Sequence, residues 1–330
     1  MSRESVNRVL RPAQDSSDLS DHAAAQAWSE CEGKTRPLLA IECLKESSRK
    51  SKVYRLQLGG EAPQLGIARW RPRPDPLDVE VFTSVLPKVG LAAPIVYGEL
   101  QSDRHGSWIF LEDLGDERPA LSSSAERRKM SEWLATLARS EIFGTLAERD
   151  CGPSHYRKML SSLRRAILED IDCPWVTPAN REFLRLALAE LVHTEQCWHH
   201  IESVCALAPR TIVHGDLVAK NIRVRRDRTH GTQLVVFDWE KAGVGVPSID
   251  LSSIPCDLDH YVSSVRSTWP TVSMPVAEDL SRIGRLFRSI ARLKWEIAAL
   301  PFEWSAEISF ERSTQLLHDA NGSLGIAART

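Results

Sequence analysis

Residues 211–224, which read "TIVHGDLVAKNIRV", constrain the fold more than any other part of the sequence. A β-branched run ends in His214-Gly215-Asp216, and a second apolar run begins directly after Asn221. β-Branched residues favour strands, whereas Gly, Asp and Asn favour turns, so the stretch predicts a strand, a polar loop and another strand. The chain must therefore present Asp216 and Asn221 from one short loop.

A second carboxylate lies a little further along the chain. Asp238 ends the apolar β run "VVFDWE", and strand ends are where polar side chains leave a core. Each of these residues alone is also an ordinary turn former. Together with Asp216 and Asn221, however, Asp238 completes a set suited to phosphoryl transfer. One Asp orients or deprotonates the attacking hydroxyl, while an Asn and another Asp supply the oxygen ligands that Mg²⁺ prefers.

The sequence before this loop favours a small antiparallel sheet. Residues 37–113 carry five short apolar or alternating segments with one helical segment, in the order strand, strand, strand, helix, strand, strand. Residues 1–36 are polar at their start and contain one short helical segment at 21–31. We therefore expect a polar tail with a short helix over 1–36 and a sheet-containing lobe over 37–113.

The remaining residues, 114–330, are mainly helical by their apolar spacing. The β signals around the opening loop interrupt a series of amphipathic segments at 123–146, 154–171, 177–207, 277–300 and 310–320. A chain of 330 residues with 42% hydrophobic residues is long enough for two domains. The predicted fold class is therefore α+β, with a small antiparallel lobe followed by a larger helical one.

Composition excludes several classes of function. The formal net charge of −2 argues against a nucleic-acid partner held by bulk electrostatics. Seven scattered cysteines form no CxxC pair, so neither a zinc ribbon nor a redox motif is indicated. No apolar run reaches the ~18 residues of a membrane span, and the polar N-terminus lacks the apolar segment of a secretory signal. We expect a cytoplasmic protein with reduced cysteines and no membrane partner.

The segment after residue 177 also places three potential metal ligands at helical spacing. If 177–207 is one helix, His193, Cys197 and His200 share a face. The apolar stripe of that helix runs along the opposite side, so we interpret the three as members of its polar face.

The motif "HGDLVAKN" followed by "FDWE" resembles the aminoglycoside phosphotransferase and choline-kinase-like family of small-molecule kinases. It is the counterpart of the catalytic loop and metal-binding motif of protein kinases. The continuation "GVGVPSIDLSS" is also similar to that family. The resemblance implies a two-lobed protein-kinase-like fold, with ATP and Mg²⁺ as cofactors and a small-molecule hydroxyl as acceptor.

The resemblance also implies roles for five residues. Asp216 would be the catalytic base, and His214 would support the geometry of its loop. Asn221 and Asp238 would bind Mg²⁺. Asp250 falls where the family has an aspartate that braces the catalytic loop.

The match is less regular at the predicted ATP site. The segment "LGIARWRP" resembles the family's third strand, but Arg69 stands where the family has a lysine, with Glu80 as its predicted partner. A shift of one residue would put Ala68 there instead. The loop "KESSRKSK" between the first two strands has no glycine and offers Ser48 and Ser51 to the phosphates.

Two further residues follow from the resemblance. "SWIFLEDLG" resembles the last strand of the small lobe as it enters the hinge, so the backbone from Glu112 to Leu114 would contact adenine.

Two hypotheses of different class follow. The first is an ATP- and Mg²⁺-dependent phosphotransferase acting on an aminoglycoside-like antibiotic, a sugar or an amino alcohol. The carboxylates that could meet a cationic acceptor, unless they are surface charges, are Asp170, Asp172, Asp257 and Asp259. The second is a catalytically degraded nucleotide-binding or scaffold relative, motivated by Arg69 and the loop without glycine.

Overall fold

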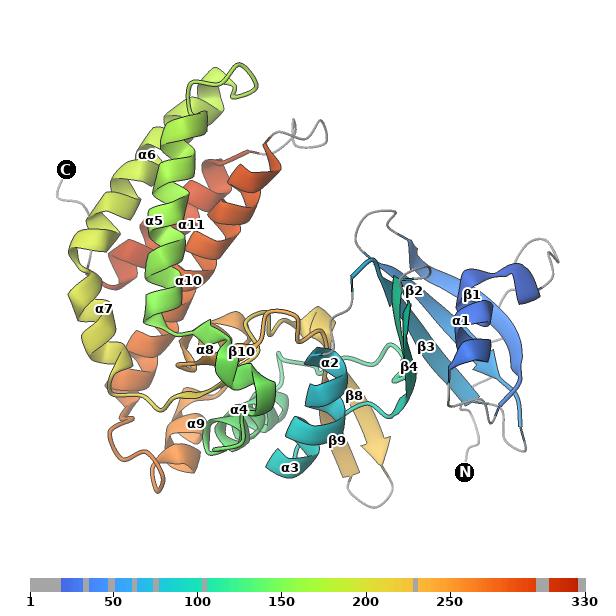
Figure 1. Cartoon of the computed structure of the whole chain (residues 1–330). Coiled ribbons are helices and arrows are strands. Elements are labelled where there is room, and N and C mark those ends of the chain that lie inside the picture. Colours follow the sequence, from blue (N-terminus) through green and yellow to red (C-terminus); the bar gives the residue numbers. More distant parts are fainter. Residues whose placement is uncertain are drawn as a thin grey trace. The chain divides into compact units, whose positions relative to one another are not determined.

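The computed structural model shows two compact units (Figure 1). The sheet unit comprises Met1–Pro87, Ala92–Glu117 and Arg223–Glu240, and the helical unit comprises Lys88–Leu91, Arg118–Ile222 and Lys241–Thr330. The residues that the structure describes are 19–31, 36–46, 51–60, 64–73, 77–102, 106–227, 231–300 and 309–325.

Five antiparallel strands form the sheet unit's main sheet, in the order β1-β2-β3-β5-β4. Their bounds are β1 Leu38–Glu46, β2 Lys52–Leu58, β3 Gln64–Arg71, β4 Val96–Ser102 and β5 Gly106–Glu112. On β3, buried and more exposed residues alternate, as the apolar pattern predicts. On β2, Tyr54, Leu56 and Leu58 belong to the core, but Arg55 between them is buried as well. The predicted α+β class and the order of elements in this region are confirmed.

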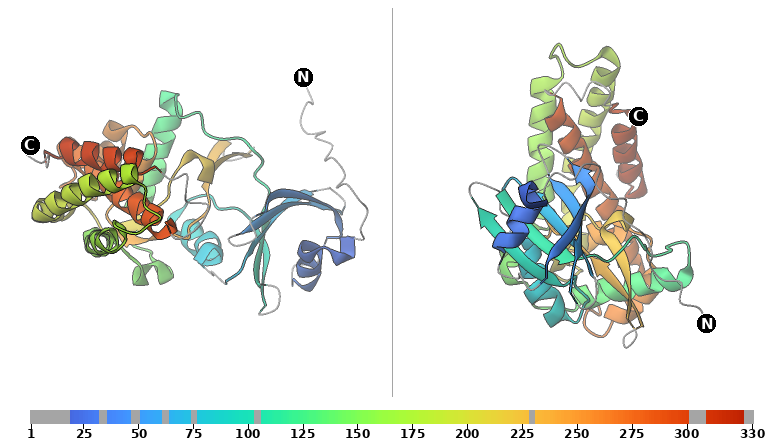
Figure 2. Two further views of the ribbon diagram at one scale, coloured as in Figure 1. Left: turned by 90° about the horizontal axis from the view of Figure 1, so that it is seen from above. Right: turned by 90° about the vertical axis from the view of Figure 1, so that its right-hand side faces the viewer.

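The helix α1 (Ala23–Glu30) forms part of this unit's core and is preceded by the short 3₁₀ helix η1 (Leu19–Asp21). The Trp28 ring meets Phe110 edge to face, with centroids 5.0 Å apart. Ala24 and Ala27 are buried in the same cluster as Tyr54 of β2. Residues 23–30 therefore fold onto the sheet (Figures 1 and 2), whereas the sequence placed them in a separate segment with the polar tail.

The segment between β3 and β4 is helical, as predicted, but it is not one regular α-helix. It runs through α2 (Leu77–Glu80), a π-helical turn η2 (Val81–Val85) and α3 (Leu86–Val89). The N–H of Leu86 donates to the carbonyl of Val81, five residues earlier. Such π turns occur often at functional sites.

A hairpin from the second half of the chain also belongs to the sheet unit. Strands β8 (Ile222–Asp227) and β9 (Gly231–Val236) pair with each other. Arg225 forms an ion pair with Glu112, and the N–H of Val224 donates to the Glu117 carbonyl at 3.0 Å. The sequence placed this hairpin in the lobe 114–330, because chain order does not show which core a hairpin joins.

The helical unit contains eight α-helices within the described residues, together with short strands and 3₁₀ turns. Its elements are α4 Ser124–Ala138, η3 Gly144–Glu148, β6 Asp150–Cys151, α5 Pro153–Asp170, α6 Pro178–Gln196, α7 Trp198–Cys205, β7 Thr211–Val213, η4 Ala219–Asn221, β10 Gly243–Gly245, α8 Ser248–Ser253, α9 Leu258–Val265, α10 Met274–Ala299 and α11 Glu311–Ser323. Figures 1 and 2 show α5, α6, α10 and α11 running alongside one another as a bundle. The Tyr156 and Phe287 rings stack between α5 and α10, with centroids 4.1 Å apart.

The predicted single helix over 177–207 is two helices. It breaks at Cys197, whose φ of −95° and ψ of 8° leave the helical range between α6 and α7. His193 and His200 therefore belong to different helices, and the predicted common face with Cys197 does not exist.

Close packing between α10 and α8 fixes the position of α8 within the helical unit. A Cβ atom on Gly284 would lie 1.9 Å from the carbonyl oxygen of Ser248, so only glycine permits this approach. The contact matters for the site because α8 carries Asp250. Among the described residues, no helix is long and apolar enough to cross a membrane.

Candidate active site

The predicted catalytic loop follows β7 and is braced by a buried carboxylate. Asp250 accepts hydrogen bonds from the backbone N–H of His214 at 2.7 Å and of Gly215 at 3.1 Å. Asp250 is 1% exposed and His214 is fully buried. The Asp250 side chain, on α8, therefore holds the backbone just before Asp216.

Two further hydrogen bonds close the loop. The N–H of Asp216 donates to Nδ1 of His214 at 3.2 Å, so His214 acts as a structural acceptor inside the loop. Nδ2 of Asn221 donates to the main-chain carbonyl of Asp216 at 3.0 Å. This bond fixes the orientation of the Asn221 amide. The side chain of Asp216 itself stays 26% exposed.

Burial makes Asp250, the carboxylate that braces the loop, a weaker acid. It raises the pKa of Asp250 to about 7, although the two backbone hydrogen bonds and the charge of Arg288 act in the opposite direction. The raised pKa shows how far Asp250 has been removed from water. The brace is thus a dry, specific contact rather than a surface ion pair.

The structure adds Lys241 to this half of the site. Its Nζ lies 3.4 Å from Oδ2 of Asp216. Lys241 comes three residues after the motif aspartate Asp238, where the quoted motif no longer specifies a role. No local sequence signal marks Lys241, because its place beside Asp216 depends on the pairing of β10 with β7.

The other half of the predicted site residues lies in the sheet unit and consists of charged side chains. Arg69 forms an ion pair with the buried Asp78 and places Nη1 3.4 Å from Oδ1 of Asp238. The sequence paired Arg69 with Glu80; the carboxylate that the structure sets against it is Asp78, two residues earlier. Glu80 was predicted from the family resemblance, and only the packing of α2 against β3 shows which of its two carboxylates faces Arg69.

The second guanidinium of β3 joins the same cluster. Nη2 of Arg71 lies 3.3 Å from Oδ1 of Asp238, 3.6 Å from Oδ2 of Asp78 and 3.1 Å from Oε2 of Glu240. Residues two apart on a strand share a face, which explains why Arg69 and Arg71 act together. Ala68 lies on the opposite face, fully buried in the core beneath α1. The alternative alignment, with Ala68 in the lysine position, therefore places no side chain at this charged face.

The backbone of Asp238 is strained. Its φ of 72° makes it the one non-glycine residue with positive φ in the described part of the chain. The next N–H, that of Trp239, donates to Oδ1 of Asp78 at 2.9 Å. Strain of this kind costs about 1–3 kcal/mol and is retained where the surrounding structure over-determines it. Asp78 holds both Arg69 and the strained turn.

The remaining predicted nucleotide contacts are placed only in part. Ser48 lies outside the described residues, and Ser51 is half-buried just before β2. The N–H of Glu112 donates to the Ile95 carbonyl at 2.8 Å, so this donor is already used within the sheet unit. Leu114 follows β5 as predicted, and its contact with adenine stays a prediction.

Two of the four carboxylates considered for a cationic acceptor, Asp257 and Asp172, have partners within the helical unit. Asp257 caps α9 by accepting from the His260 N–H at 3.0 Å, and Arg128 lies 3.3 Å from its other oxygen. Asp172 pairs with Arg181 at 3.6 Å. Asp259 is exposed. The helix cap explains Asp257 without a substrate.

Asn221 in the helical unit and Asp238 in the sheet unit each carry an oxygen donor of the kind that Mg²⁺ prefers. Mg²⁺ commonly keeps several waters beside one or two protein ligands, so the two residue types would suit that ion. Within the described residues, no group of three or more His, Cys, Asp and Glu side chains could hold a metal ion.

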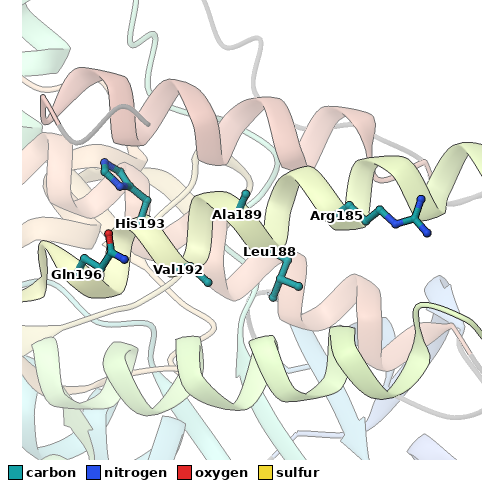
Figure 3. A pocket seen from close by; sticks show the side chains of 6 residues that line it. All are labelled: Arg185, Leu188, Ala189, Val192, His193 and Gln196. Atoms are coloured by element: carbon teal, nitrogen blue, oxygen red, sulfur yellow. The ribbon is translucent and has the colours of Figure 1, made fainter. Parts of the chain in front are cut away.

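A shallow pocket of about 440 Å³ lies away from these residues, on α6 (Figure 3). All of its lining side chains come from that helix: Arg185, Leu188, Ala189, Val192, His193 and Gln196. It contains none of the predicted site residues.

Solved structures similar to this chain share its fold. A putative fructosamine-3-kinase from Thermobifida fusca superposes with a TM-score of 0.57 at 19% identity, covering 91% of this chain and 98% of that one. A choline kinase from Streptococcus pneumoniae superposes with a TM-score of 0.55 at 16% identity, covering 87% of this chain and 94% of that one. A spectinomycin phosphotransferase in complex with ADP and spectinomycin superposes with a TM-score of 0.56 at 11% identity, covering 89% of this chain and 94% of that one. The predicted protein-kinase-like fold is confirmed.

The family follows from the sequence itself. The profile of the phosphotransferase enzyme family matches residues 82–271, more than half of the chain and the stretch that contains the catalytic loop, Asp238 and Asp250. The chain belongs to the phosphotransferase enzyme family. The comparison with curated proteins found no match.

Proposed function

We propose that the protein is a cytoplasmic ATP- and Mg²⁺-dependent phosphotransferase that phosphorylates a hydroxyl of a small molecule. Aminoglycoside-like antibiotics, sugars and amino alcohols are the acceptor classes to test. The observation that carries the proposal is the braced loop, in which Asp250 holds the backbone at His214 and Gly215 and leaves the Asp216 carboxylate partly exposed.

Asp216 is the proposed catalytic base. The acceptor's O–H proton passes to its carboxylate as the acceptor oxygen bonds to the γ-phosphorus of ATP. The bond between that phosphorus and the β,γ-bridging oxygen breaks, which releases ADP. Asp250 contributes by position: two backbone hydrogen bonds hold the loop so that Asp216 needs no reorganisation when the acceptor binds.

Asn221 and Asp238 are the proposed Mg²⁺ ligands. When bound, the ion would neutralise charge on the triphosphate oxygens. Asn221 is suited to the role because its Nδ2 is held by the Asp216 carbonyl. Arg69 and Arg71 lie against the Asp238 carboxylate and would exchange part of that contact for phosphate oxygens.

The same arginines favour the second candidate, a nucleotide-binding relative without transfer activity. Two guanidinium groups within 3.4 Å of Asp238 Oδ1 compete with a cation for that oxygen. The two functions differ in whether phosphate leaves ATP for an acceptor.

The test uses the purified full chain with Mg²⁺, [γ-³²P]ATP and the panel of acceptors. We expect transfer to at least one class and its loss in Asp216→Asn, with nucleotide binding retained. Transfer that persists in Asp216→Asn would rule out the proposed base. Nucleotide binding without transfer to any panel member would favour the second candidate.

A further inference from the structure

We infer that Lys241 is a specificity-determining residue for the acceptor. It selects hydroxyl compounds that carry a carboxylate or phosphate, or no charge, near the reacting hydroxyl, and it rejects those with an ammonium group there. The inference rests on the proposed function and narrows its acceptor class.

The backbone places Lys241 beside the catalytic loop. Strands β10 and β7 are antiparallel, with Gly243 opposite Val213. Continuing that register by two residues brings Lys241 opposite Gly215, the residue before Asp216. Gly215 confirms this close approach: its φ is +76°, and a Cβ atom on it would lie 2.6 Å from the Lys241 carbonyl oxygen.

A second contact holds the same backbone. Sγ of Cys151 lies 3.6 Å from the Lys241 carbonyl oxygen. Burial raises the pKa of the Cys151 thiol to about 11, so the group stays protonated and can donate to that oxygen. The main chain of Lys241 is thus fixed from two sides, while its side chain is 58% exposed and extends to Asp216.

The position of the ammonium group decides what can bind. Nζ lies 3.4 Å from Oδ2 of Asp216. An acceptor hydroxyl must come within about 3 Å of the same carboxylate for its proton to transfer. A positive group of the acceptor close to that hydroxyl would therefore approach Lys241 and be repelled, whereas a negative group would gain a charge-assisted hydrogen bond.

Neighbouring carboxylates do not offset this repulsion. Asp250 is buried and committed to the loop backbone. Asp257, one of the four carboxylates considered for a cationic acceptor, caps α9 and faces Arg128. Among the described residues, the carboxylate that the structure pairs with the Lys241 ammonium group is Asp216 itself.

The test measures kcat/KM for acceptors matched in everything but charge. One triplet is 3-amino-1,2-propanediol, glycerol and glycerate; a larger one is glucosamine, glucose and glucuronate. For the native protein we expect the anionic or neutral member to be preferred over the ammonium member by about tenfold. In Lys241→Glu the order should invert, and in Lys241→Met the preference should largely disappear. Lys158→Glu is the matched control, because Lys158 is an exposed lysine on α5 of the same unit.

The outcomes separate this inference from the function on which it rests. Transfer that favours the ammonium member in the native protein, or an unchanged order in Lys241→Glu, would overturn the role of Lys241 alone. No transfer to any member would overturn the proposed function and this inference together. Equal losses for all three members in Lys241→Met would show a structural role only and would likewise overturn the inference.

Discussion

The predicted site residues fall into two halves, one in each unit, and the two halves are built in different ways. In the helical unit, the loop of Asp216 is held by neutral backbone N–H groups that donate to one buried carboxylate, Asp250. In the sheet unit, Asp238 is surrounded by charged side chains from β3, with Asp78 balancing two guanidinium groups. Backbone hydrogen bonds fix geometry, whereas ion pairs can be exchanged for those of a ligand. If the proposed function is correct, we expect the loop of Asp216 to be preorganised and the cluster of Arg69, Arg71 and Asp238 to rearrange when nucleotide binds.

The largest expected effect tests the preorganised half directly. Asp216→Asn removes the base without changing its size, and we expect transfer to fall by about 10²–10⁴-fold. Stability should change little, because the side chain is partly exposed. Asp259→Asn, at an exposed aspartate of α9, is the control. A loss of less than tenfold would show that Asp216 is not the base.

The next effect tests the ion-paired half. Arg69→Met leaves Asp78 buried without its main partner, so we expect the free energy of unfolding to fall by about 3–5 kcal/mol. Adding Asp78→Asn should restore part of this loss, because Asn keeps an acceptor for the Trp239 N–H. Urea denaturation of the two variants and the wild type measures these free energies of unfolding. If the double variant is no more stable than the single one, Asp78 does not depend on Arg69.

A smaller effect tests the brace. Asp250→Ala removes the acceptor of two buried N–H groups, and we expect the free energy of unfolding to fall by about 1–3 kcal/mol. If the loop is preorganised, kcat should fall while the KM for nucleotide stays within about twofold. An effect on nucleotide KM alone would mean that the loop is not what Asp250 positions.

The smallest effect lies outside both halves and provides a baseline. The hydrogen bond from His318 to Glu190, with Nδ1 2.7 Å from Oε1, raises the pKa of His318. Its stabilisation is fully present below the unfolded pKa of about 6.5 and is lost as pH rises through the higher folded value. The thermal midpoint of wild type relative to His318→Gln should therefore decline slightly above pH 6.5, with activity at constant pH unchanged. A rise of this difference in thermal midpoint with pH would contradict the predicted stabilisation by protonated His318.

Sequence reasoning identified the site unevenly, for physical reasons. Asp216 and Asn221 were predicted from their spacing in one short loop, which limits where their side chains can go, and Asp250 was predicted from the resemblance to the family. Asp78 and Lys241 did not, because each depends on a register that local pattern does not reveal. A π-helical turn follows α2, and the position of Lys241 requires the pairing of β10 with β7. The break at Cys197 and the inclusion of α1 in the sheet core were missed because both depend on packing.

The sequence alone determined the α+β class, the order of strands and helix in the N-terminal half, and the residue types around the catalytic loop. These depend on periodicity and on turn-forming residues, which act over a few positions. Tertiary structure alone decided which charges meet: Arg69 with Asp78, Arg71 with Asp238, and Lys241 with Asp216. These ion pairs join residues of different segments of the chain, and only the packing of strands, helices and loops brings their side chains within a few ångströms.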